Sequence, residues 1–416
     1  MNRTLYSLVG YLLLPLLIIR LLVKSIKTPN YRKRLSERLG FISKIPVPII
    51  WIHCVSVGEF RASITLIDTL IKQHPNHRIL VTSTTPTGSS AIKQYYDNQV
   101  LHLYFPFDLG FIVKRYINQI QPEICILMET EIWPNLIHAL KKNNIPSILI
   151  NARMSEPSLG KYQKFASTLV SETLNNLSLI ATQNQNSADR FIQLGALKDK
   201  VTNAGNIKFD LNLSPDKVSI DQLKKIIGQR QVITFASTHQ DEEDQIITSY
   251  LKYQDQINAL LLIIPRHPER FDEVSNLAQN SNLSIVRRSS NKSAKEVNIL
   301  LGDSMGEMMS YLEISDVVFM GGSLNNTGGH NMLEPAALSK PIIFGPNVFN
   351  FSEISADLLK NKASIQVQNS DDLFEQITTL LDDFKQLKAL GKNAKTYFDS
   401  QQGAVKKIAD IINKLI

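Results

Sequence analysis

The chain has 416 residues, of which 43% are hydrophobic and 20% are charged, a composition typical of a globular protein long enough for two domains. Its two cysteines, Cys54 and Cys125, exclude a disulfide framework and fit a reducing compartment. The sequence has no CxxC pair, no HExxH motif and no D-x-D pair. We therefore expect no metal site and no cofactor.

The positive charge of the chain is concentrated at its N-terminal end. The whole chain has a net charge of +7, whereas residues 1–46 alone carry +8, because nine Lys and Arg side chains face one acid, Glu37. A nucleic-acid-binding protein would also carry basic surface within its folded body. Nucleic acid is therefore not the expected partner.

Residues 4–19 form an apolar run of sixteen uncharged residues, which is marginal for a bilayer span of about 20 residues. Basic residues follow the run instead of a small-residue cleavage site, which argues against a cleaved signal peptide. Such residues are retained on the cytoplasmic side and attract anionic lipids. We expect residues 1–30 to anchor the chain at the cytoplasmic face of the inner membrane, in one leaflet rather than across it. The alternative is an amphipathic helix that packs on the protein itself.

From residue 47 onward, short apolar runs alternate with longer segments of helical pattern. The runs predict buried strands because they are short, rich in β-branched residues and bounded by turn residues. They lie at 47–54, 78–83, 100–105, 124–129, 147–151, 177–182, 200–205, 232–237, 259–265, 297–302, 316–322 and 341–345. The first helical segments between them lie at 59–73, 86–97, 109–119 and 131–142. This alternation predicts parallel sheets with helices on both faces.

A polar stretch at 212–221 interrupts the alternation, and we interpret it as a linker. The fold class expected is α/β, with two Rossmann-like domains facing a central cleft. The N-terminal domain covers residues 31–211. The C-terminal domain covers residues 222–416 and ends in amphipathic helices from about residue 370.

Candidate reactive residues are expected directly after the strands, where doubly wound sheets bind their ligands. Glu59 follows the first strand and Gly58, which permits a tight turn. There it either takes a proton from an attacking hydroxyl group or complements the dipole of a helix. Lys208 follows a strand just before the linker, where it either meets an anionic ligand or is solvated.

The fourth strand ends in a motif with two acids, Glu129 and Glu131. Thr130 as a helix cap and Pro134 in the first turn explain part of the motif. They leave Glu129 unexplained, so we interpret it as a second acid beside Glu59. The orientation of Glu131 stays open.

The second half of the chain contains candidate anion-binding residues. Arg266 follows the strand that ends near Pro265, and it suits bidentate binding of phosphate or carboxylate. Gly306 and Glu307 follow another strand near a helix start, whose N–H groups can hold an anion.

Two glycine pairs, at 321–322 and 328–329, form a loop whose backbone can approach a ligand closely. Asn331 then opens a helix, and Glu334 lies one turn in, where a carboxylate suits ribose hydroxyls. Together these features predict a nucleotide-sugar site.

Two further patterns have ordinary structural interpretations. The acidic run at 241–244 predicts an exposed first turn of a helix rather than a metal site. His53, His239 and His330 share no metal-binding spacing, so structural or hydrogen-bonding roles are expected.

Taken together, these motifs resemble the 3-deoxy-D-manno-octulosonic acid (Kdo) transferases of lipopolysaccharide assembly. The resemblance covers nearly the whole chain. The motifs that carry it are, in order, YRKRLSERLGF, HCVSVGEF, TSTTPTGSS, METEIWPN, NARMS, GNIKFD, STHQDEE, PRHPERF, GDSMGE and GGSLNNTGGHNMLEP.

The resemblance implies a GT-B glycosyltransferase that moves Kdo, with inversion, from CMP-Kdo to a glucosamine hydroxyl of a tetraacyl lipid A precursor (lipid IVA). It implies that Glu59 is the general base and that Glu129 and Lys208 stabilise the transition state. The CMP-binding residues that it implies are Pro265, Arg266, Met305, Gly306, Glu307, Asn331, Met332, Leu333 and Glu334.

Three alternatives remain at this point. A membrane-associated GT-B enzyme using a UDP-sugar would share the fold and differ in its donor. A non-catalytic nucleotide-sugar-binding module would bind CMP but be indifferent to Glu59→Ala. An epimerase of the same architecture leaves the apolar, basic N-terminus unexplained.

Overall fold

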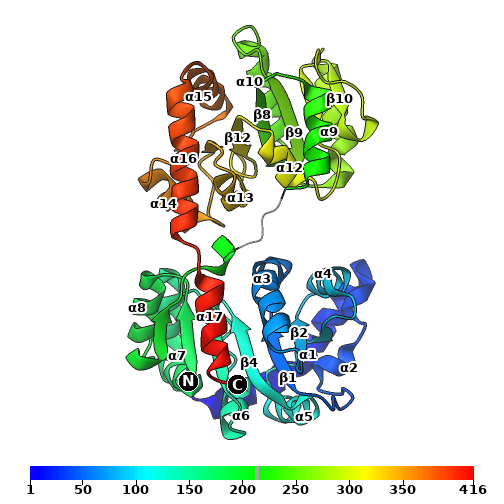
Figure 1. The fold of residues 1–416 in the computed structure, drawn as a ribbon. Helices are drawn as coiled ribbons and strands as arrows, with labels where there is room; N and C mark the ends of the chain where they lie inside the picture. The colour runs from blue at the N-terminus through cyan, green and yellow to red at the C-terminus, as the bar shows by residue number, and fades with distance from the viewer. Residues whose placement is uncertain (211–214) are drawn as a thin grey trace. The chain divides into compact units, whose positions relative to one another are not determined.

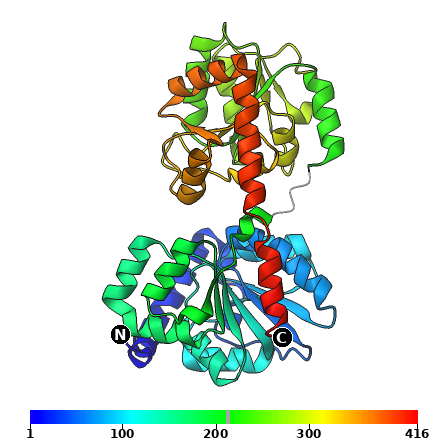
Figure 2. The ribbon, with the colours of Figure 1, turned by 60° about the vertical axis from the view of Figure 1, so that its left-hand side comes forward.

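The computed structural model describes residues 1–210 and 215–416. The chain divides into two compact units, unit 1 (Met1–Leu211 with Gln402–Ile416) and unit 2 (Asn212–Gln401). Figures 1 and 2 show that each unit, taken by itself, is a sheet covered by helices on both faces. Both termini of the chain belong to unit 1.

The sheet of unit 1 has seven strands, all parallel, in the order β3-β2-β1-β4-β5-β6-β7. Their bounds are β1 (Ile49–His53), β2 (Arg78–Ser83), β3 (Leu101–Tyr104), β4 (Pro122–Met128), β5 (Ser147–Ala152), β6 (Leu179–Thr182) and β7 (Val201–Asn203). The chain runs outward from β1 to β3 and then returns to place β4 on the other side of β1. The switch point of the sheet therefore lies between β1 and β4, where such folds bind ligands.

Helices cover both faces of this sheet. They are α1 (Arg3–Lys27), α2 (Leu35–Arg38), α3 (Val57–Gln73), α4 (Pro86–Tyr96), α5 (Gly110–Ile120), α6 (Pro134–Lys142), α7 (Glu156–Asn176), α8 (Gln185–Gln193) and α17 (Ala404–Asn413), with 3-10 turns η1 (Pro29–Tyr31), η2 (Lys198–Lys200) and η3 (Ile207–Asp210). Side chains of β1 alternate between two cores, Ile50 and Ile52 in one and Ile49 and Trp51 in the other. This is why the strand reads as a continuous apolar run.

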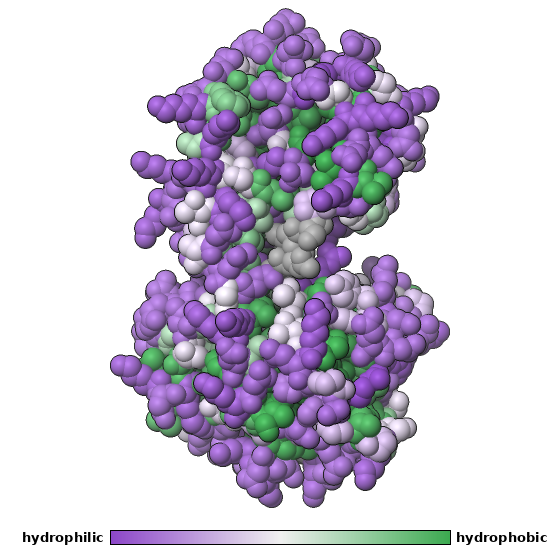
Figure 3. Space-filling model, viewed as in Figure 1, coloured by the Kyte–Doolittle hydropathy of each residue, from purple (hydrophilic) through white to green (hydrophobic). Residues whose placement is uncertain are grey.

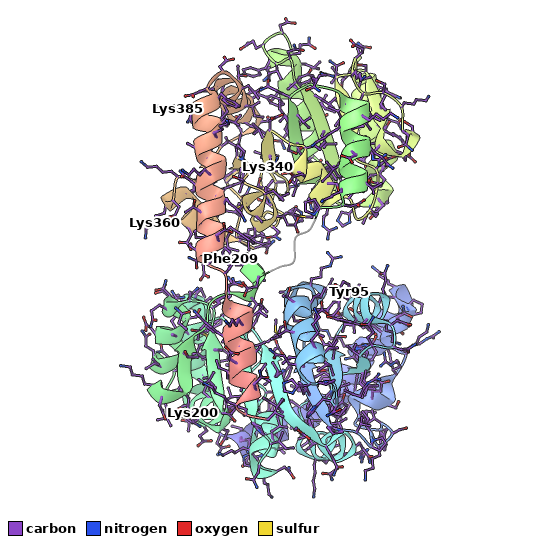
Figure 4. All side chains as sticks on the ribbon, viewed as in Figure 1. Tyr95, Lys200, Phe209, Lys340, Lys360 and Lys385 are labelled. Atoms are coloured by element: carbon purple, nitrogen blue, oxygen red, sulfur yellow. The ribbon has the colours of Figure 1, made fainter. Side chains whose placement is uncertain are left out.

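The last helix of the chain packs on unit 1, which differs from our prediction that residues 222–416 form one domain. Ile408 and Ile412 of α17 belong to the core of unit 1 on the face that α3 also covers. Asp210 in η3 accepts hydrogen bonds from the backbone N–H groups of Gly403 (2.7 Å) and Val405 (2.6 Å) at the start of the helix. The carboxylate thus satisfies two N–H groups that a helix start leaves free. Phe209, beside this helix start, is labelled in Figure 4.

Helix α1 combines packing on unit 1 with an exposed apolar face. The Tyr6 hydroxyl donates to Asp108 Oδ2 (3.0 Å), the Ser7 hydroxyl donates to Asn135 Oδ1 (2.9 Å), and the Tyr11 ring stacks on Phe111. The helix is long and apolar enough to cross a membrane by length and composition, with a mean hydropathy of 2.1. One face of α1 therefore packs on the protein itself, as the alternative interpretation requires, and the other face is exposed.

The sheet of unit 2 also has seven parallel strands, in the order β10-β11-β9-β8-β12-β13-β14. Their bounds are β8 (Val232–Thr238), β9 (Leu260–Pro265), β10 (Ile285–Arg287), β11 (Ile299–Leu301), β12 (Val317–Met320), β13 (Ile342–Phe344) and β14 (Ser364–Gln366). The switch point lies between β8 and β12. Sequence analysis missed the two edge strands, β10 and β14, because each has only three residues and carries no clear hydrophobic run.

Eight helices and two 3-10 turns surround this sheet in the described part of unit 2. They are α9 (Lys217–Ile227), α10 (Glu242–Tyr253), α11 (Phe271–Asn280), α12 (Met308–Glu313), α13 (Leu333–Ala337), α14 (Ser352–Lys360), α15 (Ser370–Asp382) and α16 (Phe384–Ser400), with η4 (Pro268–Arg270) and η5 (Arg288–Ser290). Lys340, labelled in Figure 4, donates from Nζ to the Glu313 carbonyl (2.6 Å) and so ties α12 to the segment before β13.

The stretch that we predicted as a linker, 212–221, is partly helical. Residues 217–221 form the start of α9, where Asp216 caps the helix by accepting from the N–H groups of Val218 (3.2 Å) and Ser219 (3.0 Å). Residues 211–214 lie outside the described part of the chain.

Candidate active site

Unit 1 carries an acidic site at its switch point, built from the segments that follow β1 and β4. Glu59 lies in the first turn of α3. Its N–H donates to Ser56 Oγ (3.3 Å), and its carboxylate accepts from the Val55 N–H (2.8 Å) and the Ser56 hydroxyl (3.3 Å). The sequence is the Ser-x-x-Glu of a capping box, but the carboxylate accepts from the N–H group before the N-cap residue instead of that of Ser56 itself. Glu59 thus lies in the first turn, as the helix-dipole alternative requires, and these bonds hold its carboxylate at the edge of the sheet.

The pKa of Glu59 is far from that of an ordinary carboxyl group. Burial, helped by the negative charges of Glu129 and Glu131, raises it to about 7 against the lowering effect of the Val55 and Ser56 hydrogen bonds. A carboxyl group that titrates near neutral pH is suited to general base catalysis.

Glu129 directly follows β4 and has a strained backbone. Its φ angle is +54°, in the left-handed region that residues with a side chain rarely adopt. Such strain persists where the surrounding structure holds it and clusters at functional sites. Here the Glu129 N–H donates to the Ile150 carbonyl (3.0 Å), and the Glu129 carbonyl accepts from the Arg153 N–H (3.2 Å).

Lys208 and Glu129 form an ion pair, with Lys208 Nζ 3.2 Å from Glu129 Oε1. Lys208 lies in η3, and this turn is attached to the end of β5 because the Ile207 N–H donates to Asn151 Oδ1 (3.2 Å). The structure thus brings together three of the sequence-predicted residues, Glu59, Glu129 and Lys208, at one edge of unit 1. Lys208 is therefore paired with a carboxylate of the chain itself, which neither of the two interpretations from the sequence named.

Glu131 points into the same site and resolves the orientation that the sequence left open. Its Oε2 accepts from Trp133 Nε1 (2.7 Å) and lies 3.8 Å from His53 Nε2. Burial, together with the Glu129 charge, raises the pKa of Glu131 to about 7 against the lowering effect of the Trp133 hydrogen bond. Burial also lowers the pKa of His53 to about 3, so the imidazole is neutral and does not compensate the carboxylate. His53 instead hydrogen-bonds through Nδ1 to Thr82.

The helix signal expected around Glu131 is only partly correct. Helix α6 starts at Pro134, as its first-turn position predicts, but its N-cap is Trp133 and not Thr130. Glu129, Thr130 and Glu131 therefore form the connection between β4 and α6, which leaves both glutamates at the sheet edge.

Replacing Glu131 with Gln is expected to stabilise the protein at pH 8. In the folded state the Glu131 pKa is about 7, above the ordinary value of 4.5. The folded state therefore holds a proton that the unfolded chain releases, and the stability of the wild type falls as pH rises from 4.5 to 7. The neutral amide avoids this loss, so its gain in melting temperature is a few degrees above pH 7 and vanishes below pH 4.5.

Thermal unfolding at pH 5 and pH 8 measures this difference. Glu172→Gln, at an exposed position of α7, is the matched control. A Glu131→Gln variant whose melting temperature equals that of the wild type at pH 8 would contradict a raised carboxyl pKa at this position.

Unit 2 is organised around a buried carboxylate that sequence analysis assigned wrongly. The run at 241–244 was expected to be exposed, and Asp241 and Asp244 are. Glu242 and Glu243, in contrast, are fully buried. Glu243 forms an ion pair with Arg270 (Oε1 to Nη1, 2.7 Å).

The Glu242 carboxylate accepts four backbone hydrogen bonds. Oε2 accepts from the N–H groups of His239 (3.0 Å) and Gly322 (2.6 Å), and Oε1 accepts from those of Ser323 (3.0 Å) and Leu324 (2.9 Å). Burial raises the Glu242 pKa, and the backbone hydrogen bonds oppose that rise. Glu242 thereby ties the loop after β12 to the loop after β8, across the switch point.

The glycines of this loop serve close packing. A Cβ atom at Gly321 would lie 2.6 Å from the Ser237 carbonyl oxygen, and one at Gly328 would lie 2.5 Å from the Phe349 ring. Gly322 and Gly328 also have positive φ angles. The glycine pairs that we interpreted as room for a ligand are required by the chain's own backbone and side chains at these two positions.

The remaining sequence-predicted residues of unit 2 follow strands β9 and β11. Pro265 ends β9, and the exposed Arg266 is attached to β8 because its N–H donates to the Thr238 carbonyl (2.9 Å). Met305 is 67% exposed, and a Cβ atom at Gly306 would meet nothing within 4 Å. These residues are therefore open to a ligand.

Glu307 is the N-cap residue of α12 and pairs with Arg288, which sequence analysis missed. Arg288 Nη2 lies 3.0 Å from Glu307 Oε1, and the Ser304 hydroxyl donates to Glu307 Oε2. Burial acts to raise the Glu307 pKa, but the hydrogen bonds from Ser304 and Arg288 outweigh it and hold the pKa below its ordinary value. Glu307 is thus a carboxylate at neutral pH.

Asn331 and Glu334 are joined at the start of α13, since Asn331 Nδ2 donates to Glu334 Oε1 (3.2 Å) and Asn331 Oδ1 accepts from the Leu333 N–H (3.2 Å). The side chains of Met332 and Leu333 are fully buried. Both residues are 0% exposed as a whole, so neither is open to a ligand in this structure.

The described residues, 1–210 and 215–416, contain no group of three or more His, Cys, Asp or Glu side chains arranged to hold a metal ion. Both cysteines are buried and free. The two sites therefore offer charged side chains and backbone N–H groups for recognition of a ligand.

Two parallel seven-stranded sheets in one chain, each with charged side chains at its switch point, define a protein of the GT-B architecture. Residues 33–211 match the family described as 3-Deoxy-D-manno-octulosonic-acid transferase (kdotransferase), and residues 244–397 match Glycosyl transferases group 1. The chain belongs to the Kdo transferase family, and it is a Kdo glycosyltransferase.

Relatives of this family match almost the whole chain. The 3-deoxy-D-manno-octulosonic acid transferase of Haemophilus influenzae is 40% identical over 410 residues, which cover 96% of this chain and 95% of the relative. The transferase of the same name from Bordetella pertussis is 30% identical over 384 residues, 89% of each chain.

Solved structures resemble the fold at low sequence identity. The putative UDP-N-acetylglucosamine 2-epimerase of Listeria monocytogenes has a TM-score of 0.61 and 13% identity, over 89% of this chain and 96% of that one. At this identity the similarity concerns the fold alone.

Proposed function

We propose that this enzyme transfers Kdo, with inversion, from CMP-Kdo to a glucosamine hydroxyl group of lipid IVA, a tetraacyl lipid A precursor. The observation that carries the proposal is the site at the β1/β4 switch point. There Glu59 titrates at about pH 7 beside Glu131 and the Glu129–Lys208 ion pair. Membership of the Kdo transferase family supports the sugar that is transferred.

In the proposed reaction Glu59 is the general base. Its carboxylate takes the proton of the acceptor hydroxyl as the hydroxyl oxygen forms a bond to C2 of Kdo. The bond from C2 to the CMP phosphate oxygen breaks, and CMP leaves with the electron pair. Attack on the face opposite the leaving group inverts the configuration at C2. Burial of Glu59 keeps its carboxylate poorly solvated and therefore basic.

The Glu129–Lys208 pair is proposed to stabilise charge in the transition state. C2 gains oxocarbenium character, which the Glu129 carboxylate stabilises, and the departing phosphate gains negative charge, which the Lys208 ammonium stabilises. Both groups are held before the reaction, by the strained backbone of Glu129 and by the attachment of η3 to Asn151. Such preorganised charge lowers a barrier because little reorganisation is needed.

In unit 2 the CMP moiety is proposed to contact residues from three connections. They are Pro265, Arg266, Met305, Gly306, Glu307, Asn331, Met332, Leu333 and Glu334. Arg266 supplies a guanidinium for the phosphate, and the Glu334 carboxylate suits ribose hydroxyl groups. Met332 and Leu333 are fully buried, so their contact with CMP requires the start of α13 to shift.

The donor is the sharpest test of the proposal. Purified enzyme is supplied with lipid IVA and either CMP-Kdo, generated in place, or UDP-N-acetylglucosamine, with EDTA present. Transfer of Kdo alone is expected, and it is expected to survive EDTA. Transfer from the UDP-sugar, with none from CMP-Kdo, would show a GT-B enzyme with a different donor.

The outward face of α1 is proposed to attach the enzyme to the cytoplasmic face of the inner membrane. Hydrophilic residues cover most of each unit on the face shown in Figure 3. Nearly half of the exposed large apolar side chains of the described residues belong to α1, including Leu12 (71% exposed), Leu16 (60%) and Ile26 (81%). Burial of such side chains in a leaflet, beside the basic residues that follow the helix, stabilises interfacial binding.

Replacing Leu12, Leu16 and Ile26 together with Lys is expected to release the enzyme from vesicles that contain anionic lipid. The packing contacts of Tyr6, Ser7 and Tyr11 remain, so the fold is retained. Vesicle flotation measures the bound fraction. Phe384→Lys, at an apolar side chain of unit 2 that is 63% exposed, is the control. A triple variant that floats like the wild type would place the membrane contact elsewhere.

A further inference from the structure

Two histidines face each other across the switch point of unit 2. His239 directly follows β8, and His330 lies in the glycine-rich loop after β12, the neighbouring strand. Their Nε2 atoms are 2.7 Å apart and share a hydrogen bond. The ring planes are nearly parallel, at 5°, with centroids 4.9 Å apart. The rings thus meet through their Nε2 atoms.

This contact determines how the protons of the pair are arranged. A neutral imidazole has one N–H group, so one ring donates from Nε2 and the other keeps its proton on Nδ1. The neutral pair therefore presents one Nδ1–H donor and one bare Nδ1. Neither Nδ1 has a partner among the residues that the structure describes. One added proton would turn the pair into a cation with two outward Nδ1–H donors.

The surroundings of the pair favour an anion. Arg266 and His267 follow the adjacent strand β9, and the His267 ring lies edge-on to His239 at 5.3 Å. Burial, together with the charges of Arg266 and His267, lowers the pKa of both members, and that of His330 falls to about 4. An anion bound here would offset these charges and thereby favour protonation.

The other charged groups near the pair have partners, and His267 itself lies 3.9 Å (Nδ1 to Oε1) from the Glu269 carboxylate. Arg270, which also lowers the His239 pKa, forms ion pairs with Glu243 and Glu273. The Glu242 carboxylate is occupied by four backbone N–H groups, including that of His239. On the other side of His330, Glu334 accepts a hydrogen bond from Asn331. Glu242 is thus a positioning residue that holds the backbones on both sides of the pair.

We propose that His239 and His330 form an anion-binding pair that takes up one proton when the phosphate or the carboxylate of an acidic nucleotide sugar binds. The step adds a solvent proton to the pair and breaks no bond of the ligand. The proposal rests on the proposed function, in which unit 2 binds the donor. The proposal goes beyond that function because it assigns two further residues to ligand recognition and a proton uptake to ligand binding.

Calorimetric titration with CMP tests whether the pair binds the phosphate. The experiment is run at pH 8, where the CMP phosphate carries no proton, in two buffers of different ionisation enthalpy, so that proton uptake by the protein is measured. We expect the wild type to take up a fraction of a proton, and this fraction should increase when the titration is repeated at lower pH. In His239→Gln and His330→Gln this uptake is lost, and CMP affinity falls by about tenfold, the effect of one charge-assisted hydrogen bond.

Further measurements distinguish the phosphate from the sugar carboxylate and show whether each variant is folded. Cytidine, which lacks a phosphate, should bind without proton uptake. If the pair binds the sugar carboxylate instead, the variants keep the CMP affinity of the wild type, but their KM for CMP-Kdo rises about tenfold with little change in kcat. His77→Gln, in unit 1, is the matched control, and thermal unfolding shows that each variant is folded.

The proposal is wrong if both variants match the wild type in CMP affinity, proton uptake and KM for CMP-Kdo. A wild type that binds UMP in place of CMP would overturn the donor assignment instead. The pair would then be tested with UMP by the same measurement, so the two failures are distinguishable.

Discussion

Replacing Glu59 with Gln is expected to lower kcat by about 10²- to 10⁴-fold, the usual contribution of a positioned general base, with CMP affinity unchanged. Gln keeps the size of the side chain and still fits the capping box with Ser56. The amide oxygen can accept from the Val55 N–H as the carboxylate does. The loss of rate would therefore report the missing base rather than a damaged helix start.

The pH dependence gives this prediction a second measurement. The base must be ionised to act, and the Glu59 pKa is about 7. The kcat of the wild type should therefore rise with pH through about 7. Because Glu59, Glu129 and Glu131 interact, this apparent pKa belongs to the group of carboxyls as a whole. The rise should disappear in Glu59→Gln.

The matched control is Glu123→Gln. Glu123 lies near the start of β4, at the opposite end of that strand from Glu129, and pairs with His77. Its replacement should leave both kcat and the pH profile unchanged. A Glu59→Gln enzyme with full activity would remove Glu59 from the proposed mechanism and make Glu131 the candidate base.

Replacing Glu242 with Gln is expected to destabilise unit 2 by about 3 kcal/mol and to weaken CMP binding. Each carboxylate oxygen accepts two backbone N–H groups. Whichever way the Gln amide is oriented, its NH₂ group faces two N–H donors that then lack an acceptor. A buried donor without an acceptor costs about 1–3 kcal/mol.

Chemical denaturation measures the stability of the Glu242→Gln variant, and titration measures its affinity for CMP. Asp244→Asn, at an exposed position in the same turn of α10, is the control and should behave like the wild type. In transfer assays the KM for CMP-Kdo should rise more than kcat falls, because unit 1 keeps its base. Unchanged stability in Glu242→Gln would mean that the carboxylate does not hold the loop.

The strands of both sheets were largely predictable from the sequence. Strands such as β1 and β8 are buried on both faces, so they appear as short apolar runs whatever their neighbours are. Because reactive residues follow such strands, Glu59, Glu129 and Lys208 could be proposed before the structure. What could not be predicted was the strain at Glu129 or the pKa of Glu59, since both depend on neighbouring elements.

The long-range contacts that could not be predicted from the sequence share one physical cause, although a hydrogen-bonding role for His239 and His330 was expected and is confirmed. Glu242 looked like part of an exposed acidic turn because three of its four partners lie 80 to 82 residues further along the chain. His239 and His330 are 91 residues apart and showed no common spacing. The one available signal was position, since both loops follow strands that flank a switch point.

By itself the sequence determined all strands except β10 and β14, the apolar N-terminal helix and the acids at the strand ends, because each depends on the order of residues over a few positions. Only the tertiary structure decided that Glu242 is buried, that His239 meets His330 and that α17 completes unit 1. These outcomes depend on which distant segments satisfy a buried polar group or cover an apolar face. The free energy of burying a carboxylate depends on partners that the neighbouring sequence does not contain.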